Sequence, residues 1–86
     1  MEKILYHASF RVEMGCGIDL WRICGEHNGK TLWIGTPVKI LETDSENDSV
    51  TVETISGSVY RMYGPFSENF KKDLQEVIDN KGFKAI

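Results

Sequence analysis

Residues 38–55 read VKILETDSENDSVTVETI, and this stretch decides the fold that the sequence predicts. Apolar residues alternate with polar ones on both sides of a centre rich in Asp, Ser and Asn. Such a pattern is typical of two antiparallel strands joined by a polar loop. The register that keeps the apolar residues on one face pairs Ile40 with Val52 and Val38 with Thr54. It leaves a three-residue loop made of Ser45, Glu46 and Asn47.

This predicted hairpin carries much of the negative charge of the chain. No base lies between Lys39 and Arg61, whereas the whole chain has 13 acids and 10 bases. Clustered carboxylates can engage a basic surface of another protein and raise the rate of association. We therefore predict that residues 42–53, the acidic hairpin, bind a partner with a basic site, as a nucleic-acid mimic or an inhibitor would. The alternative is a solvated loop. The candidate partner-binding residues are Glu42, Asp44, Glu46, Asp48 and Glu53.

The first strand is predicted over residues 2–14, where apolar and polar residues alternate. In this interpretation the alternating apolar set faces the core, and Leu5 interrupts the polar face. The apolar set consists of Ile4, Tyr6, Ala8, Phe10 and Val12.

A second hairpin is predicted over residues 18–36. Its turn is Asn28-Gly29, the preferred dipeptide for a two-residue type I′ turn. The pairing that follows places Ile23 opposite Ile34 and Gly25 opposite Leu32 on the core face, with Cys24 opposite Trp33 on the other face.

The hydrophobic period changes near the C-terminal end of the sequence. A tight turn at residues 56–58 leads into a short strand over residues 59–63, and residues 68–80 predict an amphipathic helix. Ser67 is a suitable N-cap and Gly82 a suitable left-handed C′ residue. The apolar stripe of the helix is Phe70, Leu74, Val77 and Ile78.

These elements add up to an α+β fold in a single domain, residues 1–86. We expect about five short antiparallel strands in a strongly bent sheet or small SH3-like barrel, capped by the C-terminal helix. A flatter sheet with the helix across one face is the competing arrangement. A chain of 86 residues supports one modest core, which favours a binding module over an enzyme with a buried cleft.

Composition sets further expectations. No apolar run approaches the roughly 20 residues that a membrane span needs, and residues 1–7 lack the features of a signal peptide. We therefore expect a cytoplasmic, non-enzymatic protein without a cofactor or a membrane partner, and Cys16 and Cys24 in the reduced state. A net charge of −3 makes nucleic acid an unlikely nonspecific partner.

Two other classes of function stay open from the sequence. The first is a small nucleic-acid-binding barrel, in which Trp33 and Tyr60 would stack on bases and Arg61 would contact phosphate. Aromatic residues at alternate strand positions are, however, typical of cross-strand core pairs. Oligomeric state is also open, because exposed sheet edges invite pairing.

The second class is a metal or thiol site. Asp44, Glu46 and Asp48 match the first ligands of a calcium loop, but positions 6 and 12 carry Ser49 and Ile55 instead of the required Gly and Glu. The remaining set, which lacks the paired spacing of structural zinc sites, is His7, Cys16, Cys24 and His27. We expect no metal, and we keep Cys16 between its two glycines as a candidate thiol.

Residues 4–10 read ILYHASF and resemble the first strand motif of ADP-ribosyltransferase folds. In that family the motif Tyr-His-Gly-Ser/Thr places a histidine on the nicotinamide cofactor. Ala8 stands where glycine is usual, and the chain is too short for the later tyrosine and glutamate strands of the family. We therefore expect no such activity.

Overall fold

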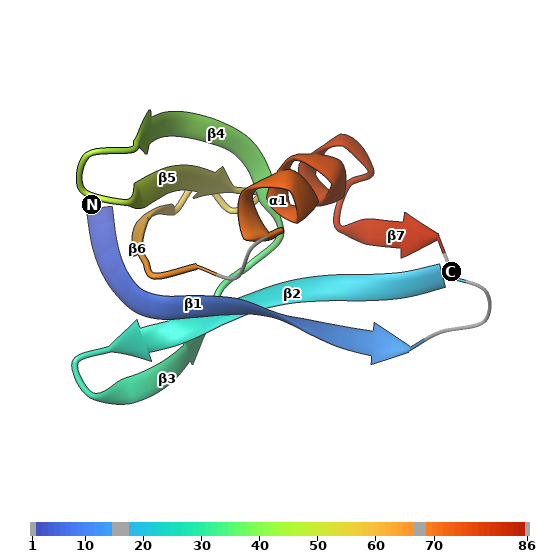
Figure 1. The fold of residues 1–86 in the computed structure, drawn as a ribbon. Helices are drawn as coiled ribbons and strands as arrows, with labels where there is room; N and C mark the ends of the chain where they lie inside the picture. The colour runs from blue at the N-terminus through green and yellow to red at the C-terminus, as the bar shows by residue number, and fades with distance from the viewer. Residues whose placement is uncertain (1, 15–17, 67–68, 86) are drawn as a thin grey trace.

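The computed structural model describes residues 2–14, 18–66 and 69–85, and it shows a small α+β fold with one mixed sheet and one helix (Figure 1). The elements are β1 (Glu2–Met14), β2 (Ile18–His27), β3 (Lys30–Trp33), β4 (Pro37–Asp44), β5 (Ser49–Thr54), β6 (Val59–Tyr63), α1 (Phe70–Asp79) and β7 (Phe83–Ala85). The sheet has the order β3-β2-β1-β6-β5-β4, and β7 pairs with β2 off this path. It is open, since β3 and β4 form its ends and do not pair within the described residues. The described residues form seven strands, so the expected count of about five is wrong.

The expectation of a purely antiparallel sheet is wrong at its centre. β1 and β6 pair in parallel, with Ile4 opposite Arg61 and Tyr6 opposite Tyr63. Turn sequences such as Asn-Gly predict the pairing only of two strands that a short turn joins. Residues 2–6 and 59–63 are joined by most of the chain, so no local pattern could indicate this pairing. It links the hairpin of β2 and β3 to the strands of the acidic hairpin.

A β-bulge divides β1 into two halves, and it changes which of the alternating side chains point toward the core. The register against β2 shifts between Tyr6 and Ser9, and His7 has a φ of 54°. An extra residue in one strand reverses which side chains face the core. Leu5 is accordingly fully buried before the bulge and Ala8 after it. The predicted core face is thus right for Ala8 and wrong for Ile4 and Tyr6, which are 40% and 50% exposed, and for Val12, which is 42% exposed.

The hairpin of β2 and β3 confirms the predicted turn and register. Asn28 and Gly29 have φ values of 52° and 76°, as a type I′ turn requires. Gly25 pairs with Leu32, and Cys24 pairs with Trp33. Gly25 also permits the close approach of β1, because a Cβ there would lie 2.7 Å from Leu5 Cδ2.

The acidic hairpin forms β4 and β5, with two differences from the predicted register. Ile40 pairs with Val52 as predicted, but bulges in β4 place Pro37 rather than Val38 opposite Thr54. The turn has four residues, 45–48, and ends on Asp48 with a φ of 50°. β4 is an edge strand, and bulges of this kind protect such edges from pairing with other chains.

The helix confirms the predicted apolar stripe and begins slightly later than predicted. Phe70, Leu74 and Val77 are buried, and Ile78 packs against the core. Asn69 is the N-cap residue, while the expected cap Ser67 lies outside the described residues. Gly82 adopts a φ of 92° and donates its N–H to the Val77 carbonyl over 2.8 Å, which completes a Schellman motif. The C-cap is Asn80 and the left-handed C′ residue is Lys81, with a φ of 58°, so the predicted C′ position of Gly82 is wrong by one residue.

The core lies between α1 and the sheet face that it covers (Figure 1). We call that face the inner face and the opposite one the outer face. On the inner face, β5 and β6 contribute Val50, Val52, Tyr60 and Met62. The alternate residues of the same strands therefore form the outer face.

Candidate functional site

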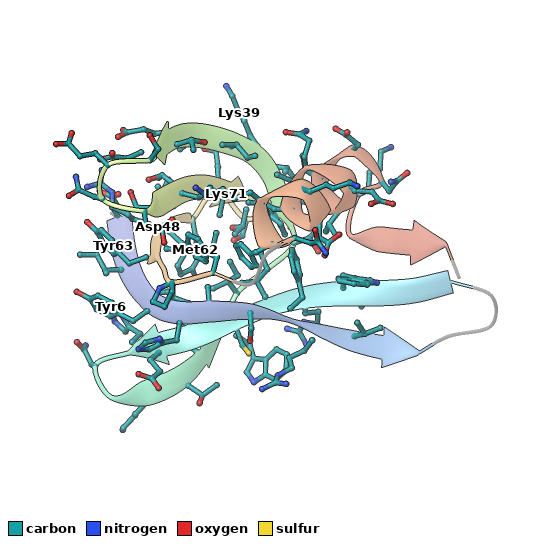
Figure 2. The ribbon with its side chains drawn as sticks, in the orientation of Figure 1. Tyr6, Lys39, Asp48, Met62, Tyr63 and Lys71 are labelled. Carbon is teal, nitrogen blue, oxygen red and sulfur yellow. The ribbon has the colours of Figure 1, made fainter. Side chains whose placement is uncertain are left out.

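A row of residues crosses the six strands from β3 to β4 on the outer face. The pairings of the sheet place the row in the order Thr31, Glu26, Tyr6, Tyr63, Ser49 and Asp44. The two tyrosine rings stack at its centre, with centroids 5.7 Å apart and planes 20° apart. Figure 2 shows both tyrosines pointing away from α1, and Tyr6 is half exposed. The centre of the outer face is therefore aromatic and open to solvent.

Arg61 lies beside the tyrosine pair in the next row of the outer face. Its Nε donates to Glu2 Oε1 over 2.8 Å and to Thr51 Oγ1 over 3.4 Å. A hydrogen bond to Tyr63 and the nearby carboxylates of Glu2 and Glu42 raise the pKa of the Arg61 guanidinium. These contacts hold a permanent cation in the middle of an acidic face.

Asp44 shapes the turn of the acidic hairpin. Its Oδ1 accepts the backbone N–H groups of Glu46 and Asn47 over 3.0 and 3.2 Å, and its Oδ2 accepts Asn47 Nδ2 over 2.8 Å. The side-chain and backbone hydrogen bonds from Asn47, in that order, lower the pKa of Asp44. Its charge is therefore present at neutral pH, but its oxygens serve the turn.

Asp48 contacts residues outside the acidic hairpin. Its carbonyl accepts the Gly64 N–H over 2.8 Å, and its carboxylate lies 3.6 Å from Lys71 Nζ on α1 (Figure 2). A Cβ at Gly64 would collide with the Asp48 carboxylate, so glycine fits this crossing. Asp48 thus ties the hairpin to the segment that leads into α1.

The structure brings only part of the predicted partner-binding set together. Glu42 and Glu53 flank Thr51 on the outer face, and Glu53 also pairs with Lys39 in register. Glu46 is exposed at the turn. The five carboxylates consequently split into Glu42, Asp44 and Glu53 on the outer face, Glu46 at the turn and Asp48 beside α1, and Asp44 also accepts the hydrogen bonds of the turn.

The residues predicted to bind nucleic acid do not meet. Tyr60 is 8% exposed and belongs to the core, where no base can stack on it. Arg61 lies on the outer face of β6, next to Glu2. Trp33 is 46% exposed on β3, with the Arg22 guanidinium carbon 5.4 Å from its ring centroid.

The candidate metal and thiol residues are also apart. His27 Nδ1 lies 3.0 Å from the Ile4 carbonyl, and Cys24 is buried with its Sγ 3.9 Å from Ser9 Oγ. Cys16 lies outside the described residues. Within the described part of the chain, no group of three or more His, Cys, Asp and Glu side chains could hold a metal ion.

The sequence prediction is wrong for Tyr6, which it places in the core, and it does not single out Glu26 as a site residue. The pattern predicts a buried Tyr6 because apolar residues recur at every second position across residues 4–12. Leu5 carried the signal that could have corrected this assignment, because one apolar residue in the wrong phase is typical of a bulge. Glu26 reaches the tyrosines only through the register of β1 and β2.

Comparison with protein-family models gives no match, and no curated protein or solved structure matches the chain significantly. In residues 2–14, 18–66 and 69–85, the helix is too short and too polar to span a membrane.

Proposed function

We propose that this protein is a non-enzymatic interaction module whose outer face binds a lysine- and arginine-rich segment of another protein. The observation that carries this proposal is the stacked pair of Tyr6, which is half exposed, and Tyr63, which is half-buried, at the centre of a face rimmed with carboxylates. A buried aromatic pair would serve the core, whereas an exposed pair offers ring faces and edges to a partner.

The charges around the tyrosines favour a cationic partner. Arg61 and Lys39 are the bases among the paired outer-face positions of β4, β5, β6 and the first half of β1. Glu26 is the direct partner of Tyr6, and the other carboxylates of this face lie further along or across the sheet: Glu2, Glu42, Asp44 and Glu53. Lysine and arginine side chains bind aromatic rings by cation–π attraction, and carboxylates steer them to the site.

An open pocket of about 390 Å³ adjoins Tyr6 on this side of the molecule. Its lining residues are Glu2, Lys3, Ile4, Tyr6, His27 and Asn28. The methylene stem of a lysine or arginine could lie along Ile4 and Tyr6 while its charged end approaches Glu2, which would then be shared with Arg61. We therefore extend the proposed interface from the acidic hairpin to this pocket.

The test uses a fluorescent synthetic peptide of alternating arginine, lysine and glycine, with binding measured by fluorescence anisotropy at low salt. Replacing both Tyr6 and Tyr63 with serine removes two cation–π partners at about 0.5–1 kcal/mol each, which corresponds to a roughly 5- to 30-fold loss of affinity. Ile55→Ser is the control, because Ile55 is 75% exposed at the turn after β5 and does not line this pocket.

A second set of variants tests whether the peptide binds the outer face specifically or is attracted to the acidic protein in general. The pair Glu42→Gln and Glu53→Gln should weaken binding more than the pair Glu76→Gln and Asp79→Asn on α1. Equal losses in the two pairs, or no loss in the double tyrosine variant, would exclude the outer face as the binding site.

A further inference from the structure

A second pocket opens at the edge of the sheet, where the C-terminal end of α1 meets the beginning of β4. We call it the edge pocket, and its volume is about 510 Å³. Its lining residues are Thr36, Val38, Ile55, Ile78, Asp79 and Lys81. Among the described residues it shares no lining residue with the pocket beside Tyr6, so the two pockets belong to different surfaces.

Two aliphatic side chains of the edge pocket are exposed to water. Ile55 follows β5 and is 75% exposed, whereas the other large exposed apolar side chains of the described residues are 40–50% exposed. Val38 is 42% exposed. The register of β4 against β5 skips Val38 at a bulge, and bulges turn side chains out of the ladder. Single apolar residues on a surface are ordinary, but an exposed pair that lines one pocket indicates a contact site.

The rim of the edge pocket carries one charge of each sign. Asp79 is the last residue of α1, and its Oδ1 accepts a hydrogen bond from Gln75 Nε2 over 2.9 Å. Lys81 has a left-handed backbone, with a φ of 58°, and donates its N–H to the Ile78 carbonyl over 3.2 Å. Both charged residues are exposed. The end of the helix therefore fixes an acid and a base beside the exposed aliphatic pair.

This surface is complementary to a second copy of itself. In a two-fold dimer the same surface patch of both copies meets, so every contact between two different residues forms twice. Ile55 of each copy can then enter the edge pocket of the other, while Asp79 of each copy faces Lys81 of the other. A basic partner would be repelled by Lys81 and an acidic partner by Asp79. A second copy pairs both charges, and this charge complementarity favours it as the occupant.

We propose that the edge pocket is the interface of a symmetric homodimer. The contact is made by side chains, since the bulges of β4 oppose continuous pairing between strand edges. One pocket with two exposed aliphatic residues corresponds to the smaller class of interfaces, which are weak. The dimer therefore forms at high protein concentration and dissociates on dilution. It does not depend on the peptide binding proposed above, because it uses a different surface.

Sedimentation velocity of the full chain, in a concentration series from about 10 μM to about 1 mM, measures the dissociation constant of the dimer. Ile55→Ser should raise that constant at least about tenfold, because each dimer buries two copies of this side chain. Val38→Ser should raise it as well. The matched control is Val12→Ser, since Val12 is also a valine that is 42% exposed, but it lies on β1. Its dissociation constant should stay near that of the wild type.

Charge reversal tests the two-fold arrangement directly. Asp79→Lys gives the rim two bases and Lys81→Asp gives it two acids, so each variant should associate with itself at least about fivefold more weakly than the wild type. An equimolar mixture of the two variants should form a dimer again, because every base then faces an acid of the other chain. A surface that binds no second copy would show no such recovery.

Equal urea midpoints of dilute samples establish that the variants are folded. The proposal is overturned if the wild type stays monomeric across the series or forms an assembly larger than a dimer. It is also overturned if Val12→Ser weakens association as much as Val38→Ser, or if the mixed charge variants associate no better than each alone. Ile55→Ser should still bind the basic peptide as the wild type does, so failure of the dimer and failure of peptide binding are distinguishable results.

Discussion

Shortening Leu5 should be far more destabilising than shortening its neighbour Ile4, although both are aliphatic residues of β1. Leu5 is fully buried against Gly25, whereas Ile4 is 40% exposed on the outer face. Large-to-small changes in a core cost about 2–5 kcal/mol for Leu→Ala. We expect Leu5→Ala to reduce the free energy of unfolding by about 3 kcal/mol and Ile4→Ala by less than about 1 kcal/mol.

The contact with Gly25 allows a sharper version of this prediction. Gly25→Ala alone adds a Cβ 2.7 Å from Leu5 Cδ2, and such overpacking costs about 1–3 kcal/mol. When Leu5 is also alanine, that methyl group is gone, and the nearest atoms of the new Cβ are Leu5 Cβ at 3.1 Å and the Tyr6 carbonyl at 3.2 Å. The double variant should therefore lose at least about 1 kcal/mol less than the sum of the two single losses.

Urea unfolding followed by tryptophan fluorescence measures the free energy of unfolding of the wild type, of the three single variants and of the double variant. Thermal melts provide a check. A loss of about 3 kcal/mol corresponds to a fall in Tm of roughly 12–24 °C for a domain of this size. If Leu5→Ala and Ile4→Ala have equal costs, the bulge at His7 does not set the inward face of β1. If the two single losses simply add, Gly25 and Leu5 are not in contact.

The remaining predictions concern the turns. Gly82→Ala should lower stability by about 1–3 kcal/mol, measured by urea unfolding, because Gly82 has a φ of 92° and an added Cβ would lie 2.8 Å from Thr36 Cγ2; an unchanged midpoint would contradict the left-handed cap. Gly29→Ala, at a φ of 76° with no atom near its Cβ, should cost only about 1 kcal/mol from backbone strain alone, so a larger loss would point to an unseen contact. The lowered pKa of Asp44 stabilises the folded state above the ordinary Asp pKa of about 3.9, and this contribution is lost as the pH falls through the lower folded value. Wild-type stability should therefore fall relative to Asp44→Asn when urea midpoints are compared between about pH 6 and pH 2.5, and a constant difference would refute the role of Asp44 in the turn.

The local features of this fold could be predicted from the sequence because their signals involve neighbouring residues. Asn28-Gly29 determined the turn and register of one hairpin. The spacing of Phe70, Leu74 and Val77 determined the buried stripe of α1. In each case the deciding residues lie within a few positions of one another, and their backbone preferences act before any tertiary contact forms.

The features that could not be predicted depend on long-range pairing. The parallel pairing of β1 with β6 has no local signal, and the bulge at His7 appears in the sequence only as the misplaced apolar residue Leu5. The candidate site depends on both features. Without the bulge Tyr6 would face the core, and without the parallel pair it would not stack on Tyr63.

The separation of the five hairpin carboxylates into different groups also follows from tertiary structure. Composition shows five carboxylates without a base between Lys39 and Arg61. The fold then brings Arg61 near Glu42 and Lys71 beside Asp48, so part of the hairpin charge is offset by bases from other elements. The sequence gives the total charge of the hairpin but not the positions of its counter-ions.

The pairing of β1 with β6 has a consequence for the order in which the chain assembles. Ile4 and Arg61 are 61 − 4 = 57 residues apart, and a ribosome adding roughly 5–20 residues per second needs about 3–11 s to make that length. Both hairpins can close in microseconds once they are synthesised, whereas β1 can gain its second neighbour only after β6 has emerged. Folding dominated by such distant contacts is slow relative to helical proteins of the same size. Until then one edge of β1, including Leu5, stays open to other chains, and this nascent strand is where we expect aggregation to begin.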